Sequence, residues 1–303
     1  MSKPLVSVII NCLNGQEFLK KAIDSILYQS YQNWELIFWD NNSVDKTKEI
    51  VNSYNDNRIK YYLSEKTYPL GQARNLAITK TKGDFLTFLD CDDWWELNRL
   101  ENIIDKFTDN KVGVVYSNGY VFNQESDKYR CFYYLKPKEG WLFKSLIARY
   151  NIYMPSTIFR KEALEGLDYI FNPNFSMIEE AELIIRLAKT WKIAYVDKKL
   201  CYWRAHKNSL SWVKQDNFAK ENTVLINYLE SNYPYLSKDK CLNKFKARNS
   251  YRIFLANWKK GILKREVIFP YLLIDTRLIA FYLLSFLPLK ITMIILRIVG
   301  KEI

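Results

Sequence analysis

Three carboxylates lie within four consecutive residues of the chain, in the run Asp90-Cys91-Asp92-Asp93. The run follows residues 84–89, a mostly apolar stretch that predicts a buried strand. Carboxylates this close repel one another unless a cation neutralises them. A hard divalent ion such as Mn²⁺ or Mg²⁺ takes oxygen ligands and can act as a Lewis acid toward a diphosphate. The run therefore predicts a metal site at the end of a strand. Acids that complement a helix N-terminus are the simpler structural alternative.

The elements that must position these acids are strands and helices in alternation. Buried strands are predicted over 6–10, 35–39, 59–63 and 84–89, with helices between them. This order indicates an α/β fold with a mostly parallel, Rossmann-like sheet flanked by helices. Ligands bind at the carboxyl ends of the strands in such sheets. Polar residues follow three of the strands, at Asn11, at 40–43 and at 90–93, so we expect them to meet in one cleft.

A second acidic cluster opens the segment 178–188, which predicts an amphipathic helix with Glu179 and Glu180 in its first turn. First-turn acids also complement the helix dipole, and Glu182 can pair with Arg186 four residues later. A purely structural role is therefore an alternative for this cluster.

The polar motifs share an order and a spacing along the N-terminal half. They are VSVIINCLN at 6–14, WDNNSVD at 39–45, ARN at 73–75 and FLDCDD at 88–93. Together they resemble the motifs of family 2 glycosyltransferases. The resemblance implies the GT-A fold, a nucleotide-sugar donor, a divalent metal (Mn²⁺ or Mg²⁺) and inversion at the anomeric carbon.

The resemblance also implies roles for single residues on the donor side. It places the end of the first strand (Asn11, Asn14) and Asp40 with Asn41 around the nucleotide base, and Arg74 beside the base or diphosphate. Asp90 and Asp92 share the ribose and metal contacts, with Asp93 as a further metal ligand, and the motif leaves open which Asp binds the metal directly. Many relatives have Pro in place of Asn11 and Asp in place of Asn41. An Asn carbonyl still accepts the N3–H of uracil, so a UDP-sugar is the expected donor.

On the acceptor side, an inverting transferase needs a general base for the attacking hydroxyl. In the family the second acid of the pair that opens the 178–188 helix is this base, so the resemblance assigns the role to Glu180, supported by Glu179. His206 is the only histidine and lies in a segment that resembles the family's metal- or diphosphate-binding histidine segment. Arg204 is a weaker diphosphate candidate. Trp95 is a candidate for stacking on a sugar, although buried tryptophans are equally common.

The domain prediction follows the change of pattern along the chain. Residues 1–215 form the transferase domain, with a nucleotide-sugar half (1–105) and an acceptor half (106–215). Residues 216–303 form a basic, apolar helical extension. Lys240, Lys244, Arg248 and Arg252 lie four apart and predict a basic stripe on a helix. The apolar runs after it are too short to span a bilayer, so we expect this region to lie on an anionic membrane surface. Packing against the sheet domain or a partner subunit is the alternative.

Composition limits the remaining choices. The chain has a net charge of +12 and five cysteines without a C-x-x-C pair. It shows neither a zinc motif nor a signal-peptide pattern, which favours a cytoplasmic protein, peripheral on the inner face of the membrane. The expected acceptor is a saccharide or a polyprenyl-linked saccharide of cell-surface glycan synthesis.

Three other functions compete with the transferase as explanations of the sequence. A sugar nucleotidyltransferase needs a basic, Gly-rich loop after the first strand, whereas 11–15 has one Gly and no basic residue. A nucleic-acid-binding protein would place aromatics among its basic residues on a recognisable module, so no nucleic-acid partner is expected. A non-catalytic nucleotide-, sugar- or membrane-binding protein of the same fold is the main alternative.

Overall fold

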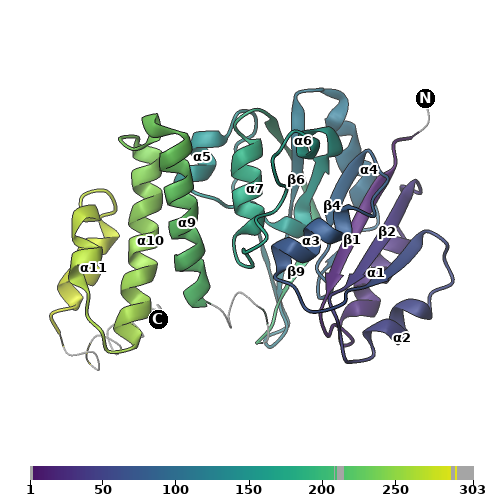
Figure 1. Cartoon of the computed structure of the whole chain (residues 1–303), viewed down its shortest axis with the longest axis horizontal. Helices are drawn as coiled ribbons and strands as arrows, with labels where there is room; N and C mark the ends of the chain where they lie inside the picture. Colours follow the sequence, from purple (N-terminus) through teal and green to yellow (C-terminus); the bar gives the residue numbers. More distant parts are fainter. Residues whose placement is uncertain (1–2, 208, 210–214, 288–290, 292–303) are drawn as a thin grey trace. The chain divides into compact units, whose positions relative to one another are not determined.

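The computed structural model describes residues 3–207, 209, 215–287 and 291 (Figure 1). The chain divides into two compact units. One comprises residues 1–143 and 151–209, and the other comprises residues 144–150 and 210–303. The first holds the sheet and the second is helical.

The N-terminal half of the sheet is parallel, in the order β3-β2-β1-β4. These strands are β1 (Val6–Cys12), β2 (Trp34–Asp40), β3 (Ile59–Leu63) and β4 (Phe85–Phe88). The helices between them are α1 (Leu19–Leu27), α2 (Thr47–Asn52) and α3 (Leu70–Ile78). All four predicted strands are present, so the polar residues that follow β1, β2 and β4 share the carboxyl edge of the sheet.

Beyond β4 the sheet becomes mixed. The next strands are β8 (Thr157–Arg160), β6 (Val112–Asn123), β9 (Lys192–Ala205) and β5 (Trp94–Trp95), and β7 (Lys128–Cys131) pairs with β6. β8 runs antiparallel to both β4 and β6, while β9 runs parallel to β6. The helices of this half are α4 (Arg99–Ile104), α6 (Lys161–Glu165) and α7 (Glu179–Leu187). The mostly parallel character predicted from the sequence therefore applies to the N-terminal half.

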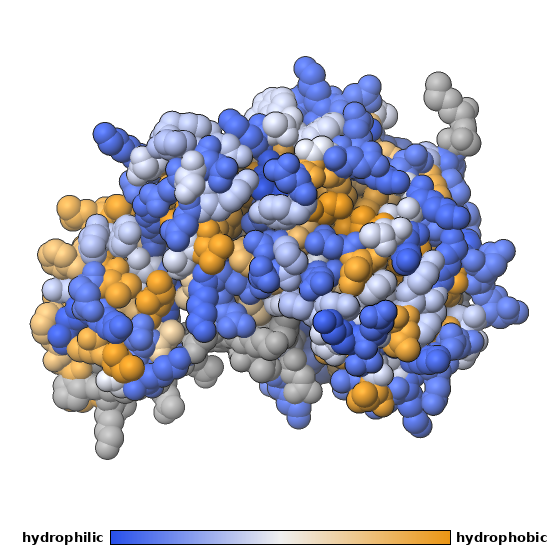
Figure 2. Space-filling model, in the orientation of Figure 1, coloured by the Kyte–Doolittle hydropathy of each residue, from blue (hydrophilic) through white to orange (hydrophobic). Residues whose placement is uncertain are grey.

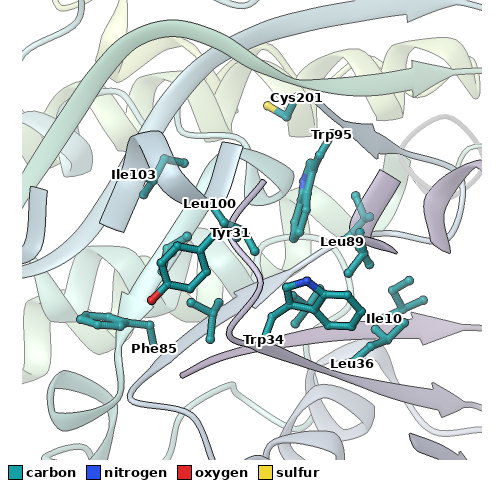
Figure 3. Packing of buried hydrophobic residues seen from close by; sticks show 14 of the residues in the cluster. Ile10, Tyr31, Trp34, Leu36, Phe85, Leu89, Trp95, Leu100, Ile103 and Cys201 are labelled. Carbon is teal, nitrogen blue, oxygen red and sulfur yellow. The ribbon is translucent and has the colours of Figure 1, made fainter. Parts of the chain in front are cut away.

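The core follows the period-two alternation of the strands. Alternate residues of β1 (Val6, Val8, Ile10 and Cys12) are buried in a cluster with the apolar face of α1 and with residues of β2. Figure 3 shows part of this cluster, where Ile10, Trp34 and Leu36 lie near Leu89. Because successive side chains point to opposite faces, Asn11 lies on the face of β1 opposite to Cys12.

The helical unit is built on two long helices. They are α9 (Gln215–Asn232) and α10 (Lys240–Lys259), with α11 (Arg277–Leu284) and the short turns η4 (Arg265–Val267) and η5 (Phe269–Tyr271) after them. α5 (Phe143–Ala148) contributes the residues of this unit that precede α9. Asp239 caps α10, since its side chain accepts a hydrogen bond from the Cys241 backbone N–H at 2.9 Å. Among the residues described, none of the helices combines the length and apolar character needed to cross a bilayer.

Close packing at the start of α3 gives a stability prediction. A Cβ atom on Gly71 would lie 2.2 Å from the backbone oxygen of Asn172, whereas one on Gly166 would meet nothing within 4 Å. We expect Gly71→Ala to lower the free energy of unfolding by about 1–3 kcal/mol, because backbone must move to admit the methyl group. Gly166 has a φ of −79°, which alanine also adopts, so Gly166→Ala is the matched control. Urea denaturation measures both, and equal midpoints would contradict the predicted close approach.

Candidate active site

A buried arginine joins the acidic run to the second acidic cluster. Arg74 on α3 is 2% exposed. Its Nη1 donates to Glu179 Oε1 at 2.6 Å, and its Nη2 donates to Asp90 Oδ1 at 3.2 Å. Its guanidinium carbon lies 5.5 Å from the ring centroids of Phe88 and Phe171. Arg74 thus holds together Asp90, at the start of the acidic run, and Glu179, the first residue of α7.

This contact differs from the role expected for Arg74 beside the base or diphosphate. Two of the guanidinium nitrogens already bond protein carboxylates, and the side chain is buried. Arg74 instead acts as the counter-charge that keeps two acidic elements together. A sequence motif gives the residue type and not its partner, so these two contacts are visible only in the structure.

Glu180 lies directly after the arginine-bound Glu179. Desolvation and the neighbouring Glu179 carboxylate raise the pKa of Glu180 well above the ordinary 4.5, and Arg74 opposes this effect. A carboxylate with a raised pKa holds a proton more strongly near neutral pH, which suits a general base. The side chain is partly exposed, whereas Glu179 is 2% exposed.

The acidic run also meets the end of β9. Asp92 Oδ2 lies 2.9 Å from His206 Nε2, and the two side chains are 26% and 14% exposed. The ring of Phe18 packs against that of His206, with centroids 5.2 Å apart. Residues 114 positions apart in the sequence are therefore paired at a partly open site.

Asp93 and Arg204 fasten the same turn from inside. Asp93 is 1% exposed, and its Oδ1 accepts a hydrogen bond from the Arg204 backbone N–H at 2.8 Å. Burial, with the nearby Asp92 and Asp90, raises the pKa of Asp93 well above its usual range. Arg204 donates from Nε to the Asp92 backbone oxygen at 2.8 Å and stacks on Phe18. Both side chains are therefore largely buried. The roles of Asp93 as a metal ligand and of Arg204 as a diphosphate contact stay predictions.

Hydrogen bonds of Asp40 and Asn41 hold the loop that follows β2. Asp40 accepts from the Ser43 backbone N–H and from the Tyr61 hydroxyl, both at 2.7 Å. The Asn41 amide donates to Tyr68 O at 2.9 Å and accepts from Tyr68 N at 3.1 Å. Asp40 thus shapes the loop, and Asn41 retains one lone pair on its carbonyl oxygen for a base.

The two asparagines after β1 differ in their use. Asn14 has a φ of 55°, and its Oδ1 accepts from the Val44 backbone N–H at 2.9 Å, so it ties the β1 and β2 loops together. The Asn11 side-chain oxygen and nitrogen are buried and form no hydrogen bond in the described structure. Buried amides are nearly always hydrogen-bonded, so Asn11 offers an unused donor and acceptor to a ligand.

Trp95 does not line the site. It is 3% exposed, its Nε1 donates to Pro155 O at 2.9 Å, and the Arg99 guanidinium carbon lies 3.9 Å from its ring centroid. Figure 3 shows it in the apolar cluster with Leu100 and Cys201. The prediction of a sugar-stacking ring was wrong for Trp95, because β5 pairs with β9 and places the ring in the core.

Two aromatic contributors were not found from the sequence. Phe18 contacts both His206 and Arg204, and Tyr61 bonds Asp40. In the sequence, Phe18 is an apolar residue between two predicted strands and Tyr61 lies within the strand predicted over 59–63, so neither stands out as a site residue. Each of these rings lies next to polar residues at the end of a strand, Phe18 at the end of β9 and Tyr61 at the end of β2. The spacing of apolar residues in the sequence does not show such neighbours.

Comparison with known proteins gives the family. The model for "Glycosyl transferase family 2" matches residues 7–167. The chain belongs to this family.

Curated relatives match in the same region. An Escherichia coli protein named UDP-Glc:alpha-D-GlcNAc-diphosphoundecaprenol beta-1,3-glucosyltransferase is 36% identical over 126 residues, 42% of this chain and 50% of that protein. An uncharacterized glycosyltransferase of Rickettsia typhi is 36% identical over 182 residues, 55% of each chain. The match spans about half the length of these relatives.

Solved structures show the fold. S. aureus TarS 1–349 in complex with UDP-GlcNAc aligns with a TM-score of 0.64 at 20% identity, over 84% of this chain and 77% of that one. The mannosyltransferase PcManGT from Pyrobaculum calidifontis, in complex with GDP-Man and Mn²⁺, aligns with a TM-score of 0.59 at 15% identity, over 99% of this chain and 89% of that one. The predicted GT-A fold is confirmed.

The side chains of the candidate site can be compared with the ligands that a divalent metal ion requires. Among the residues described, no group of three His, Cys, Asp or Glu side chains is arranged to hold a metal by itself. Asp92 Oδ2 and His206 Nε2 lie 2.9 Å apart, however. Adjacent ligands of an octahedral ion with bonds of about 2.1 Å lie roughly 3 Å apart. This pair therefore fits two positions of such an ion, and a bound diphosphate and water would supply the others, as is common for Mg²⁺ sites.

The buried network gives the second stability prediction. Arg74→Met leaves Glu179 and Asp90 without their counter-charge, so we expect the free energy of unfolding to fall by about 3–5 kcal/mol. The double variant Arg74→Met/Glu179→Gln removes one orphaned charge and is expected to recover part of the loss. Lys161→Met breaks the exposed Lys161–Glu165 pair and is expected to cost at most about 1 kcal/mol. Equal losses for Arg74→Met and Lys161→Met in urea denaturation would contradict the buried network.

Proposed function

We propose that this chain transfers a sugar from a UDP-sugar to a hydroxyl of a saccharide acceptor, with inversion at the anomeric carbon and with a divalent metal. One observation carries the proposal. Arg74 ties the acidic run to the start of α7, so Asp92 and His206 on the donor side and Glu180 on the acceptor side belong to one connected structure. The UDP-GlcNAc complex of TarS and the UDP-Glc specificity in the name of the E. coli relative support a uridine donor.

Donor binding begins with the unused amide of Asn11 and the free lone pair of Asn41, which suit the hydrogen-bonding edge of uracil. Asp92 and His206 would hold Mn²⁺ or Mg²⁺ at the diphosphate. When bound, the ion supplies positive charge against the departing nucleoside diphosphate. Asp90, 38% exposed and oriented by Arg74, is available for the ribose.

Glu180 acts on the acceptor. Its carboxylate accepts the proton of the acceptor hydroxyl as that oxygen attacks the anomeric carbon. The bond from this carbon to the diphosphate breaks at the same time, and the nucleoside diphosphate leaves with the electron pair. Attack from the face opposite to the leaving group inverts the configuration. Glu179 contributes by raising the pKa of Glu180.

The acceptor and the location belong to the same proposal. The name of the E. coli relative specifies a diphosphoundecaprenol-linked GlcNAc acceptor. We propose a polyprenyl-linked saccharide of cell-surface glycan synthesis as acceptor, reached by peripheral attachment of residues 238–303 to the inner face of the cell membrane. The basic α10 and the exposed apolar residues of α11 support this attachment.

Calorimetric titration of UDP tests the donor site. We expect binding with Mn²⁺ that EDTA weakens at least tenfold, because the metal joins the diphosphate to the protein. Asp92→Ala and His206→Ala should each remove most of the metal-dependent part. Asp168→Ala deletes an exposed carboxylate outside the site and should bind like the wild type. Metal-independent binding that is equal in all variants would contradict the assigned ligands, and silence toward every nucleotide would favour the non-catalytic alternative.

The raised pKa of Glu180 gives a pH prediction. The base must be ionised to act, so kcat/KM for transfer should fall as the pH drops through a pKa well above 4.5. Glu180→Gln should lower kcat by about 100- to 10,000-fold while leaving UDP affinity unchanged.

The contribution of Glu180 to the free energy of unfolding should fall as the pH rises, whereas its contribution to activity should increase. A carboxyl whose folded-state pKa is raised favours folding at low pH, and this contribution is lost as the pH rises through the folded pKa. Glu180→Gln is therefore expected to increase the free energy of unfolding at pH 8 relative to the wild type. A variant with full activity, or one that is less stable at pH 8 with UDP binding intact, would argue against Glu180 as the base.

A further inference from the structure

Four arginines of the helical unit lie near enough for three of them to act electrostatically on the fourth, Arg248. Arg149 follows α5, Arg248 and Arg252 lie one turn apart on α10, and Arg277 opens α11. Arg248 Nη2 lies 3.4 Å from the Ile147 backbone oxygen, which places α5 against α10. The neighbours of Arg248 and Arg277, which are Ala247 and Leu278, share one buried cluster.

The positive charges in this cluster are poorly neutralised. Burial and the charges of Arg252, Arg149 and Arg277 lower the pKa of Arg248 to about 10. Asp275 is the acid beside the cluster, and both of its oxygens already bond Arg277, at 2.8 and 2.5 Å. Within the described residues, Arg149, Arg248 and Arg252 form no ion pair. Guanidinium groups gathered in this way favour an anion, and their geometry matches phosphate oxygens.

Exposed apolar side chains lie on both sides of Arg277 in the sequence. Leu273 is 92% exposed, Leu283 62% and Phe286 60%, whereas Leu278 and Phe281 on the other face of α11 are buried. Figure 2 shows apolar side chains gathered at the surface in the region of α11. Apolar side chains exposed to solvent beside basic residues are typical of a protein that lies in a membrane interface.

The charge of the unit fits an anionic surface. Residues 144–150 and 215–287 contain fourteen Lys and Arg against six Asp and Glu, a net charge of +8 out of the chain's +12. Basic residues near an anionic lipid surface each contribute to attachment, and exposed apolar side chains add to it. A free phosphate would use the arginines and leave the apolar face unexplained, so a lipid accounts for both.

We propose that Arg149, Arg248, Arg252 and Arg277 bind the phosphate group of an anionic membrane lipid, while the exposed apolar residues Leu273, Leu283 and Phe286 enter the interface. This inference rests on the peripheral attachment proposed above and assigns it to residues. Of the basic stripe predicted from the sequence, only Arg248 and Arg252 belong to the proposed site. Lys240 and Lys244 lie about 12 and 6 Å from Arg248 along α10, toward the N-terminus of this helix.

A vesicle-binding experiment with the full chain tests the site. The wild type should co-sediment with phosphatidylglycerol–phosphatidylcholine vesicles (1:1) and only weakly with phosphatidylcholine alone. Arg149→Gln/Arg252→Gln changes two exposed side chains, so folding should be preserved. Its partition coefficient should be about thirtyfold lower, from roughly 1 kcal/mol for each basic residue at an anionic surface.

The control variant carries the same charge change on the same helix. Lys240→Gln/Lys244→Gln also alters two exposed residues, and it should lose no more than about threefold. Leu283→Ser/Phe286→Ser should weaken binding without changing net charge. Equal losses in the two charge variants would overturn the arginine site in favour of diffuse attraction. Binding of inorganic phosphate without vesicle binding, or a dimer that buries α11, would overturn the lipid assignment.

The outcome is separable from the transferase proposal. UDP affinity with Mn²⁺ should be the same in all of these variants, because none lies at the candidate active site. Vesicle binding that survives in a protein unable to bind any nucleotide would contradict the proposed transfer reaction and leave the lipid site standing.

Discussion

The ion-pair network of Arg74 with Glu179 and Asp90 is the interaction on which the rest of the candidate site depends. A guanidinium that is 2% exposed is costly to bury without counter-charges, and the first turn of α7 and the turn after β4 supply them. Such a network adds little net stability compared with apolar packing of the same volume, but its loss is costly. Its value here is positional, because it fixes the start of α7 relative to the acidic turn.

A second set of buried contacts holds the acidic turn against β9. Asp93 and Arg204 fasten the acidic turn to β9 from within, which leaves Asp92 and His206 at the partly open surface as a pair. Aromatic rings of Phe18 and Phe88 cover the two guanidinium groups and lower the local dielectric constant. A family 2 glycosyltransferase thereby separates charged residues into two groups. One group is buried and fixes the geometry of the acidic turn, and the other, Asp92 with His206, is partly exposed.

The sequence was sufficient for the elements and for their order. The buried apolar strands and the polar residues at their ends predicted that these residues meet at the carboxyl edge, and the parallel register of the strands places them there. It was not sufficient for the burial and partners of Arg74, Asp93, Arg204 and Trp95. Each of these belongs to a correctly located motif or run, yet each faces inward, and the direction of a side chain depends on partners more than fifty residues away. Asn11 was located by its place after the first strand, its role came from the resemblance, and its unused amide is visible only in the structure.

A structure of the chain crystallised with UDP and Mn²⁺ tests the central claim most directly. The account predicts an ion bound by Asp92 and His206 together with diphosphate oxygens. Arg74 should remain between Glu179 and Asp90, without a contact to the nucleotide. A structure in which Arg74 leaves Glu179 and bonds the diphosphate, or in which the ion is bound by Asp93 after the turn has reorganised, would contradict it.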